Sequence, residues 1–77
     1  MDRNKDKNEE QTPTVTRAEE LLRKPQYSPQ EAAEVLQLRE RTINSAVYGG
    51  ELKGLVINGD IVSIERGDLI DWLRRRA

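Results

Sequence analysis

The 77-residue chain contains no cysteine and no histidine. It therefore has no disulfides, no thiol nucleophile, no imidazole base and none of the usual ligands of zinc, haem iron or iron–sulfur clusters. We expect no metal site and no cofactor. Paired carboxylates such as Asp68 and Asp71 need an enclosed pocket to act as acid and base, and so small a domain has little room for one. We accordingly expect a protein that is not an enzyme and has no small-molecule substrate.

Long apolar runs and an excess of positive charge are also lacking. No segment approaches the roughly 20 apolar residues that cross a bilayer, and residues 1–11 are charged where a signal peptide needs an apolar stretch. We expect a cytoplasmic protein with no membrane partner, nucleoid-associated if it binds DNA. Lys and Arg number 13 against 14 Asp and Glu, so any surface for nucleic acid must come from local clustering of basic side chains.

Hydrophobic side chains are concentrated in the last two thirds of the chain. Residues 1–14 contain one apolar side chain besides polar and charged residues and a proline, which predicts a disordered charged tail. Residues 15–26 are predicted to form an optional short helix and a linker. The folded domain is predicted to occupy residues 27–77.

The optional helix has a recognisable start but only a short apolar stripe. Thr16 and Glu19 have the spacing of a capping box, and Pro25 stops any helix. A helix of about two turns is marginal alone. We expect it to hold only if Leu21 and Leu22 dock on the domain.

Two helices with a three-residue break between them are predicted next. Ser28 and Glu31 form a capping box with proline at the first helical position, so a helix should begin at Pro29. Residues 37–39 interrupt its apolar pattern, and a second helix should begin at about Glu40. The inward face of the first helix is predicted to consist of Ala32, Ala33, Val35 and Leu36.

The second helix has one apolar and one polar face. At about 100° per residue, its core side is predicted to contain Ile43, Ala46 and Val47. Glycines at positions 49 and 50 should end the helix, because glycine readily adopts the left-handed conformation of a helix exit. The opposite, exposed face is predicted to present Arg41, Asn44, Ser45 and Tyr48.

A β-hairpin is predicted over residues 55–64. Two β-branched runs flank Asn58-Gly59, the strongest short signal for a two-residue type I′ turn. If Ile57 faces Asp60, strict alternation divides the hairpin into two faces. One face contains Leu55, Ile57, Val62 and Ile64 and is expected to lie on the helices. The other contains Val56, Ile61 and Ser63.

A last helix is predicted at about residues 67–75. Leu69, Trp72 and Leu73 follow helical spacing, so Trp72 is predicted to lie in the core beneath the hairpin. Arginines occupy positions 74–76, where cations suit the helix C-terminus. We favour this local role for them over contact with a phosphate.

The predicted fold class is mainly α with a small β-hairpin, in the order helix, turn, helix, hairpin, helix. That order is typical of a winged helix-turn-helix. The local sequences strengthen the match: YSPQEAAEVL, RERTIN, GGEL, the Asn-Gly hairpin and DLIDWL. Over residues 27–74 the chain resembles the excisionase-like, MerR-type winged helix-turn-helix family.

The resemblance implies a partner, double-stranded DNA, and a function in transcription regulation or DNA recombination. The helix at residues 40–48 would enter the major groove and the hairpin would touch the minor groove or backbone. Arginine can pair with guanine and asparagine with adenine, although the same stripe could be a merely solvated face. Carried over by position, the residues facing DNA would be Arg39, Arg41, Thr42, Asn44, Ser45, Tyr48, Lys53 and Asn58.

Several positions depart from the family pattern. The family usually has glycine where this chain has Gln37 and a small capping residue where it has Arg39, so we expect a turn that lacks its left-handed residue and its capping oxygen. Residues 27–77 carry seven basic and eight acidic side chains. We therefore expect modest DNA affinity for a monomer and a need for several copies or a protein partner on the DNA.

A second function remains open for the same fold. Val56 and Ile61 are expected to form an outward apolar pair on the hairpin, which could meet a protein partner or another copy of the chain. The alternative is therefore a protein-interaction module, such as an antirepressor or a mobile-element accessory protein, that docks through its apolar wing.

Overall fold

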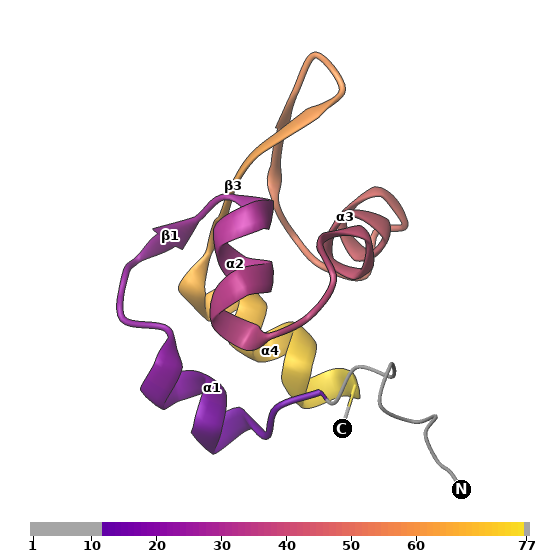
Figure 1. Ribbon diagram of the computed structural model, residues 1–77. Coiled ribbons are helices and arrows are strands. Elements are labelled where there is room, and N and C mark those ends of the chain that lie inside the picture. The colour runs from indigo at the N-terminus through magenta and orange to yellow at the C-terminus, as the bar shows by residue number, and fades with distance from the viewer. Residues whose placement is uncertain (1–11, 77) are drawn as a thin grey trace, which may run out of the picture.

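The computed structural model describes residues 12–76, so most of the predicted tail lies outside the described residues (Figure 1). Within this range the chain forms four helices and three strands, and no helix is both long and apolar enough to cross a bilayer. The prediction of a mainly helical fold with a small hairpin is confirmed. In chain order the elements are α1 (Val15–Leu21), β1 (Gln26–Tyr27), α2 (Pro29–Leu36), α3 (Glu40–Tyr48), β2 (Leu55–Ile57), β3 (Asp60–Glu65) and α4 (Arg66–Arg76).

The N-cap of α1 lies two residues earlier than predicted. Thr14, not Thr16, is the N-cap, and its hydroxyl accepts a hydrogen bond from the Arg17 amide at 3.1 Å. Ala18 and Leu22 are buried, and α1 packs against α4. Leu21 is only partly buried, so of the two predicted leucines Leu22 enters the core.

Arg66, the first residue of α4, connects α4 to the end of α1 and to the segment after it. Its guanidinium donates to the carbonyl oxygens of Leu22 at 2.6 Å and Glu19 at 2.9 Å. Its backbone N–H donates to the Pro25 carbonyl at 2.9 Å. A cation thus satisfies the carbonyl end of α1, where the helix dipole favours positive charge.

The predicted capping box begins α2. Ser28 accepts from the Glu31 amide, and the Glu31 carboxylate accepts from the Ser28 amide. The turn after α2 differs from the expectation, because Gln37 itself adopts the left-handed conformation, with φ 59° and ψ 42°. Arg39 precedes α3 and makes no side-chain capping bond, as its residue type implies. The turn therefore keeps its left-handed residue without glycine.

The sheet has three antiparallel strands in the order β1-β3-β2. Strand β1 was not predicted, because it is only two residues long and pairs with the distant residues Ile64 and Glu65. We call the β2–β3 hairpin, residues 55–65, the wing. Its turn has positive φ at Asn58 and Gly59, as a type I′ turn requires, and Ile57 pairs with Asp60 as predicted.

A register shift reverses the predicted faces of the wing. Val56 pairs with Ile61 but Leu55 pairs with Ser63, so Val62 is an extra residue in β3. This bulge shifts the alternation and places Ile61 and Ile64, three residues apart, on the side of the core. Leu55, Ile57, Val62 and Ile64 were predicted to lie on the helices. Only Ile64 is buried there, and the prediction is wrong for the other three, which are 52%, 51% and 47% exposed.

Helix α4 provides much of the core. It begins at Arg66, one residue before the predicted start, and buries Leu69, Ile70, Trp72 and Leu73. The core position of Trp72 is confirmed, with 1% of the residue exposed.

Candidate nucleic-acid interface

Helix α3 is held in place by its apolar side. Ile43, Ala46 and Val47 are buried as predicted, and the helix packs against α2, where Ala32 and Ala33 are buried and small enough for close approach. The opposite side of α3 is therefore turned outward. Arg41, Ser45 and Tyr48 are exposed, and Asn44 is half-buried.

Tyr48 connects α3 to the tip of the wing. Its side chain is exposed, and its hydroxyl donates to the Gly59 carbonyl at 2.5 Å. The predicted role of Tyr48 was contact with DNA. In the structure its hydroxyl donates to the turn of the wing, and this bond fixes the position of the wing relative to α3.

An open hollow of about 290 Å³ lies between the start of α2, α3 and β3. Asn44 and Tyr48 line it from α3, and Ile61 lines it from β3. Two acidic residues, Glu40 and Asp60, line it as well, and no Lys or Arg is among its lining residues. The acidic lining of the hollow therefore opposes a phosphate, and any attraction of this surface to a phosphate must come from the arginines of the turn and of α3.

The structure brings some of the predicted contact residues together and separates others. Asn44, Tyr48 and the wing tip with Asn58 lie around one surface, with Arg41 on the adjoining part of α3. Thr42 is half-buried, and Arg39 lies at the N-terminal end of the helix. Lys53 lies apart, at the base of the wing, where it shares two hollows with Asp68 of α4.

The start of α2 belongs to this surface, although it is not among the predicted contact residues. Ser28, Pro29 and Gln30 line the hollow together with α3. The capping box identified these residues as a helix N-terminus, where the helix dipole favours anions. That signal could have placed these residues beside α3.

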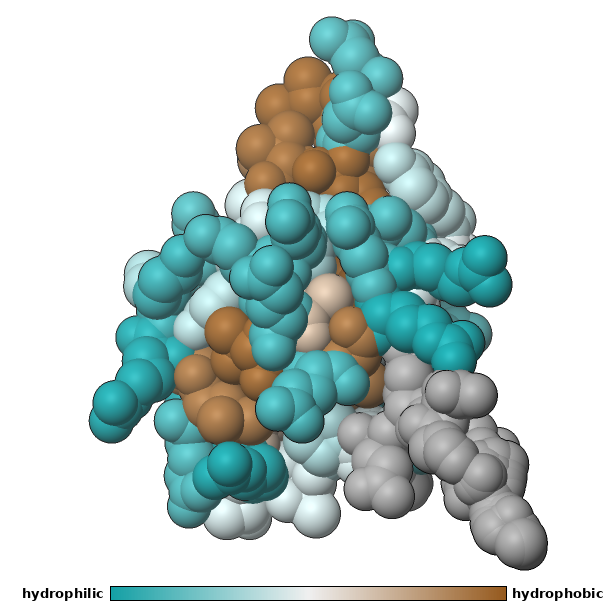
Figure 2. Space-filling view, viewed as in Figure 1, coloured by the Kyte–Doolittle hydropathy of each residue, from teal (hydrophilic) through white to brown (hydrophobic). Residues whose placement is uncertain are grey.

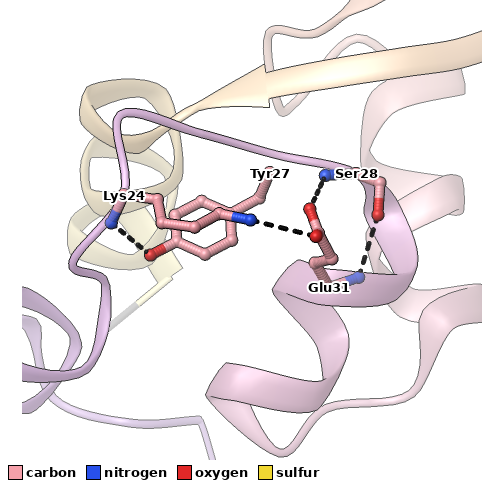
Figure 3. A network of polar contacts seen from close by, with 4 residues as sticks. All are labelled: Lys24, Tyr27, Ser28 and Glu31. Atoms are coloured by element: carbon pink, nitrogen blue, oxygen red, sulfur yellow. Dashed lines mark hydrogen bonds and ion pairs between the residues drawn. The ribbon is translucent and has the colours of Figure 1, made fainter.

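A polar network fixes the start of α2 (Figure 3). Lys24 donates its backbone N–H to the Tyr27 hydroxyl at 2.7 Å, and its ammonium contacts the Glu31 carboxylate at 2.9 Å. Glu31 also accepts from the Ser28 amide at 3.0 Å. The Ser28 hydrogen bond, followed by the bond from Lys24, lowers the pKa of Glu31 below its ordinary value of 4.5.

The C-terminal arginines are engaged within the fold. Arg75 donates to the Glu51 carbonyl at 2.8 Å and contacts Asp71 at 3.5 Å. Arg74 contacts the same carboxylate at 3.7 Å, and the Arg76 guanidinium lies 4.9 Å from the Trp72 ring centroid. These contacts agree with the local role that the sequence analysis favoured.

The surface around α3 can offer guanidinium, amide and hydroxyl groups to a ligand. Those are the groups with which proteins contact base edges and phosphates. No cluster of three potential metal ligands occurs in residues 12–76. Comparison of the chain with protein-family models, with curated proteins and with solved structures gave no match.

Proposed function

We propose that this protein is a small sequence-specific DNA-binding protein with a winged helix-turn-helix fold, acting as an excisionase-like architectural factor or a transcriptional regulator. Helix α3 would read base edges in the major groove, and the wing would contact the neighbouring DNA. Helix α2 would lie across the backbone.

One observation carries this proposal. The hydrogen bond from Tyr48 to Gly59 places the wing tip beside the exposed stripe of α3, so that both elements face the same side. A three-residue turn with a left-handed residue separates α2 from α3, as in helix-turn-helix motifs. A helix with a hairpin fixed beside it can contact the groove and the backbone of a DNA duplex at the same time.

Different side chains would have different tasks. Arg41 is fully outward and can make a bidentate contact with guanine. Asn44, on the same side of α3 and half-buried, can pair with adenine, and Ser45 can donate to a phosphate. Asn58 at the wing tip is exposed and can reach the minor groove or the backbone.

The charge distribution limits affinity. The acidic lining of the hollow and the near-zero net charge reduce the electrostatic part of DNA binding. A single module also reads only a few base pairs. Useful specificity would therefore require several copies on adjacent sites or a protein partner on the same DNA.

The test is selection of the full chain against a random-sequence duplex library, followed by affinity measurements on the enriched site. Each lost bidentate contact should cost about 1–3 kcal/mol, so the double variant Arg41→Ala, Asn44→Ala should bind far more weakly. The control Arg23→Ala removes an exposed arginine outside α3 and should have a small effect. If the double variant bound the site as well as the parent, the assignment of α3 would be lost.

The exposed wing favours a second candidate, a protein-interaction module that retains the same fold. The residues expected for this role were Val56 and Ile61, but Ile61 is partly buried against the core. Leu55, Ile57 and Val62 are exposed instead, Val56 is exposed on the other face of β2, and Figure 2 shows an apolar patch over the wing. Apolar docking should hardly respond to salt, whereas DNA affinity should fall steeply as salt rises.

A further inference from the structure

Glu40, the first residue of α3, is an exposed acid on the surface proposed to bind DNA. It lines the hollow between α2, α3 and β3 together with Asn44 and Tyr48, which follow it by one and two turns on the same side of the helix. Within residues 12–76 the carboxylate of Glu40 has no hydrogen bond or ion pair. Its oxygens are therefore available to accept hydrogen bonds from a ligand.

The negative charge of Glu40 has two opposite consequences. The helix dipole favours an acid in the first turn of α3. On a surface that binds DNA, however, the same charge repels phosphates and lowers the affinity for every duplex, whatever its sequence. An acid at this place therefore weakens binding unless a hydrogen-bond donor of the DNA meets it.

The base edges of the major groove offer two kinds of donor, the amino groups of cytosine and of adenine. The amino group of adenine lies beside a ring-nitrogen acceptor, which repels the second oxygen of a carboxylate. An amide such as that of Asn44 suits this edge better. Cytosine presents its amino group with no acceptor on the same edge. A carboxylate, which only accepts, therefore selects cytosine.

We propose that Glu40 accepts a hydrogen bond from the amino group of a cytosine and is a specificity-determining residue of the DNA site. This inference rests on the proposed function, in which α3 enters the major groove. The N-terminal residues of such a helix contact base edges. Arg41, which suits guanine, lies about 100° further around the helix axis, so the two side chains reach different bases.

The rest of the hollow favours contact with a base edge over contact with the backbone. Asp60 of β3 lines it as well, and none of its described lining residues is Lys or Arg. Two carboxylates without a cation oppose a phosphate at this place. The repulsion disfavours sequences that offer no donor to Glu40, and in this way it adds to specificity.

A double-mutant cycle between Glu40 and the base provides the test. The duplex enriched by selection with the full chain is compared with duplexes in which each of its cytosines, with the paired guanine, is exchanged for another base pair. For the parent, one such exchange should lower the affinity about tenfold. The same exchange should have little effect on Glu40→Ala. Glu40→Gln should instead prefer adenine at that position, because glutamine pairs with adenine.

Glu51→Ala is the matched control. Glu51 is also exposed, but it follows α3 and lines a different hollow with Asp71 and Arg75 of α4. Its replacement removes one negative charge, so the affinity should rise slightly and equally for all duplexes, with no change in base preference. Circular dichroism checks that each variant is folded.

The outcomes separate this inference from the proposed function. Base preferences that are the same in the parent and in both Glu40 variants would overturn the inference and leave Glu40 with a local role in the first turn of α3. An enriched site without cytosine would also overturn it. In both cases the enriched site would still support the proposed function. If no duplex is enriched, the inference and the proposed function fail together.

Discussion

At the scale of single residues, Gln37 forms the left-handed turn between α2 and α3. It is one of two non-glycine residues with positive φ among those described, and the other is Asn58 in the wing turn. A left-handed conformation costs an ordinary residue roughly 1–2 kcal/mol. The chain tolerates this cost because the turn lets both helices bury their apolar faces.

Gln37→Gly should therefore stabilise the protein. The relief of left-handed strain exceeds the added entropy of the unfolded chain, so we expect a gain of about 0.5–1 kcal/mol in the free energy of unfolding by urea. The same exchange at Gln30, which is helical, should instead cost about 1 kcal/mol. Equal losses at both positions would show that the left-handed turn is not a source of strain.

Glu31 makes stability depend on pH in the acid range. Its pKa is lowered in the folded protein, first by the Ser28 amide and then by Lys24. Its stabilising contribution is therefore present above the unfolded pKa, about 4.5, and is lost as the pH falls through the lower folded value. Glu31→Gln should be less stable than the parent at neutral pH. The difference in unfolding free energy should shrink as the pH falls below about 4.5.

Unfolding free energies measured across this pH range check the prediction. Glu34→Gln, on the exposed side of the same helix, is the matched control and should follow the parent profile. If the difference in unfolding free energy between Glu31→Gln and the parent stayed the same into the acid range, the assigned role of the carboxylate would be contradicted.

At the scale of elements, Arg66 of α4 binds the C-terminal end of α1, which Ala18 and Leu22 also anchor in the core. Arg66→Ala removes two charged hydrogen bonds to the carbonyls of Leu22 and Glu19. We expect a loss of about 1.5–3 kcal/mol and faster amide hydrogen exchange in α1. Arg74→Ala, which removes an exposed arginine of the same helix, should change stability little. Unchanged exchange in α1 would show that its packing alone holds it.

The wing depends in a similar way on Tyr48. Tyr48→Phe keeps the ring but removes the hydrogen bond to Gly59, and a loss of about 0.5–1.5 kcal/mol is expected. The main effect should be greater mobility of residues 55–65 in NMR relaxation, with weaker binding of the selected duplex. A wing as rigid as in the parent would show that the bulge and the sheet fix its position without Tyr48.

At the scale of the whole molecule, local signals predicted the elements better than their assembly. The capping box at Ser28 and the Asn58-Gly59 turn located α2 and the wing, because both depend on adjacent residues. The bulge at Val62 could not be predicted, since it depends on how the wing meets the helices, and it reversed which face is buried. Strand β1 was missed for the same reason, because its partner is distant in the chain.

The candidate site was predictable to a similar extent. Helical periodicity identified the outward side of α3, on which Arg41 is exposed and Asn44 is half-buried. The acidic hollow and the bond from Tyr48 to the wing arise only when β3 lies beside α3. These tertiary features decide how the stripe can be used, since they fix the wing and oppose a phosphate inside the hollow.

The central claim, that α3 and the wing form the DNA-binding surface, is tested most directly by NMR. Amide and side-chain signals of the full chain would be followed during titration with the duplex enriched by selection. The account predicts shifts concentrated at Arg41, Asn44, Ser45 and Asn58, with α1 unaffected. Shifts confined to other surfaces, or none at low salt for any enriched duplex, would contradict it.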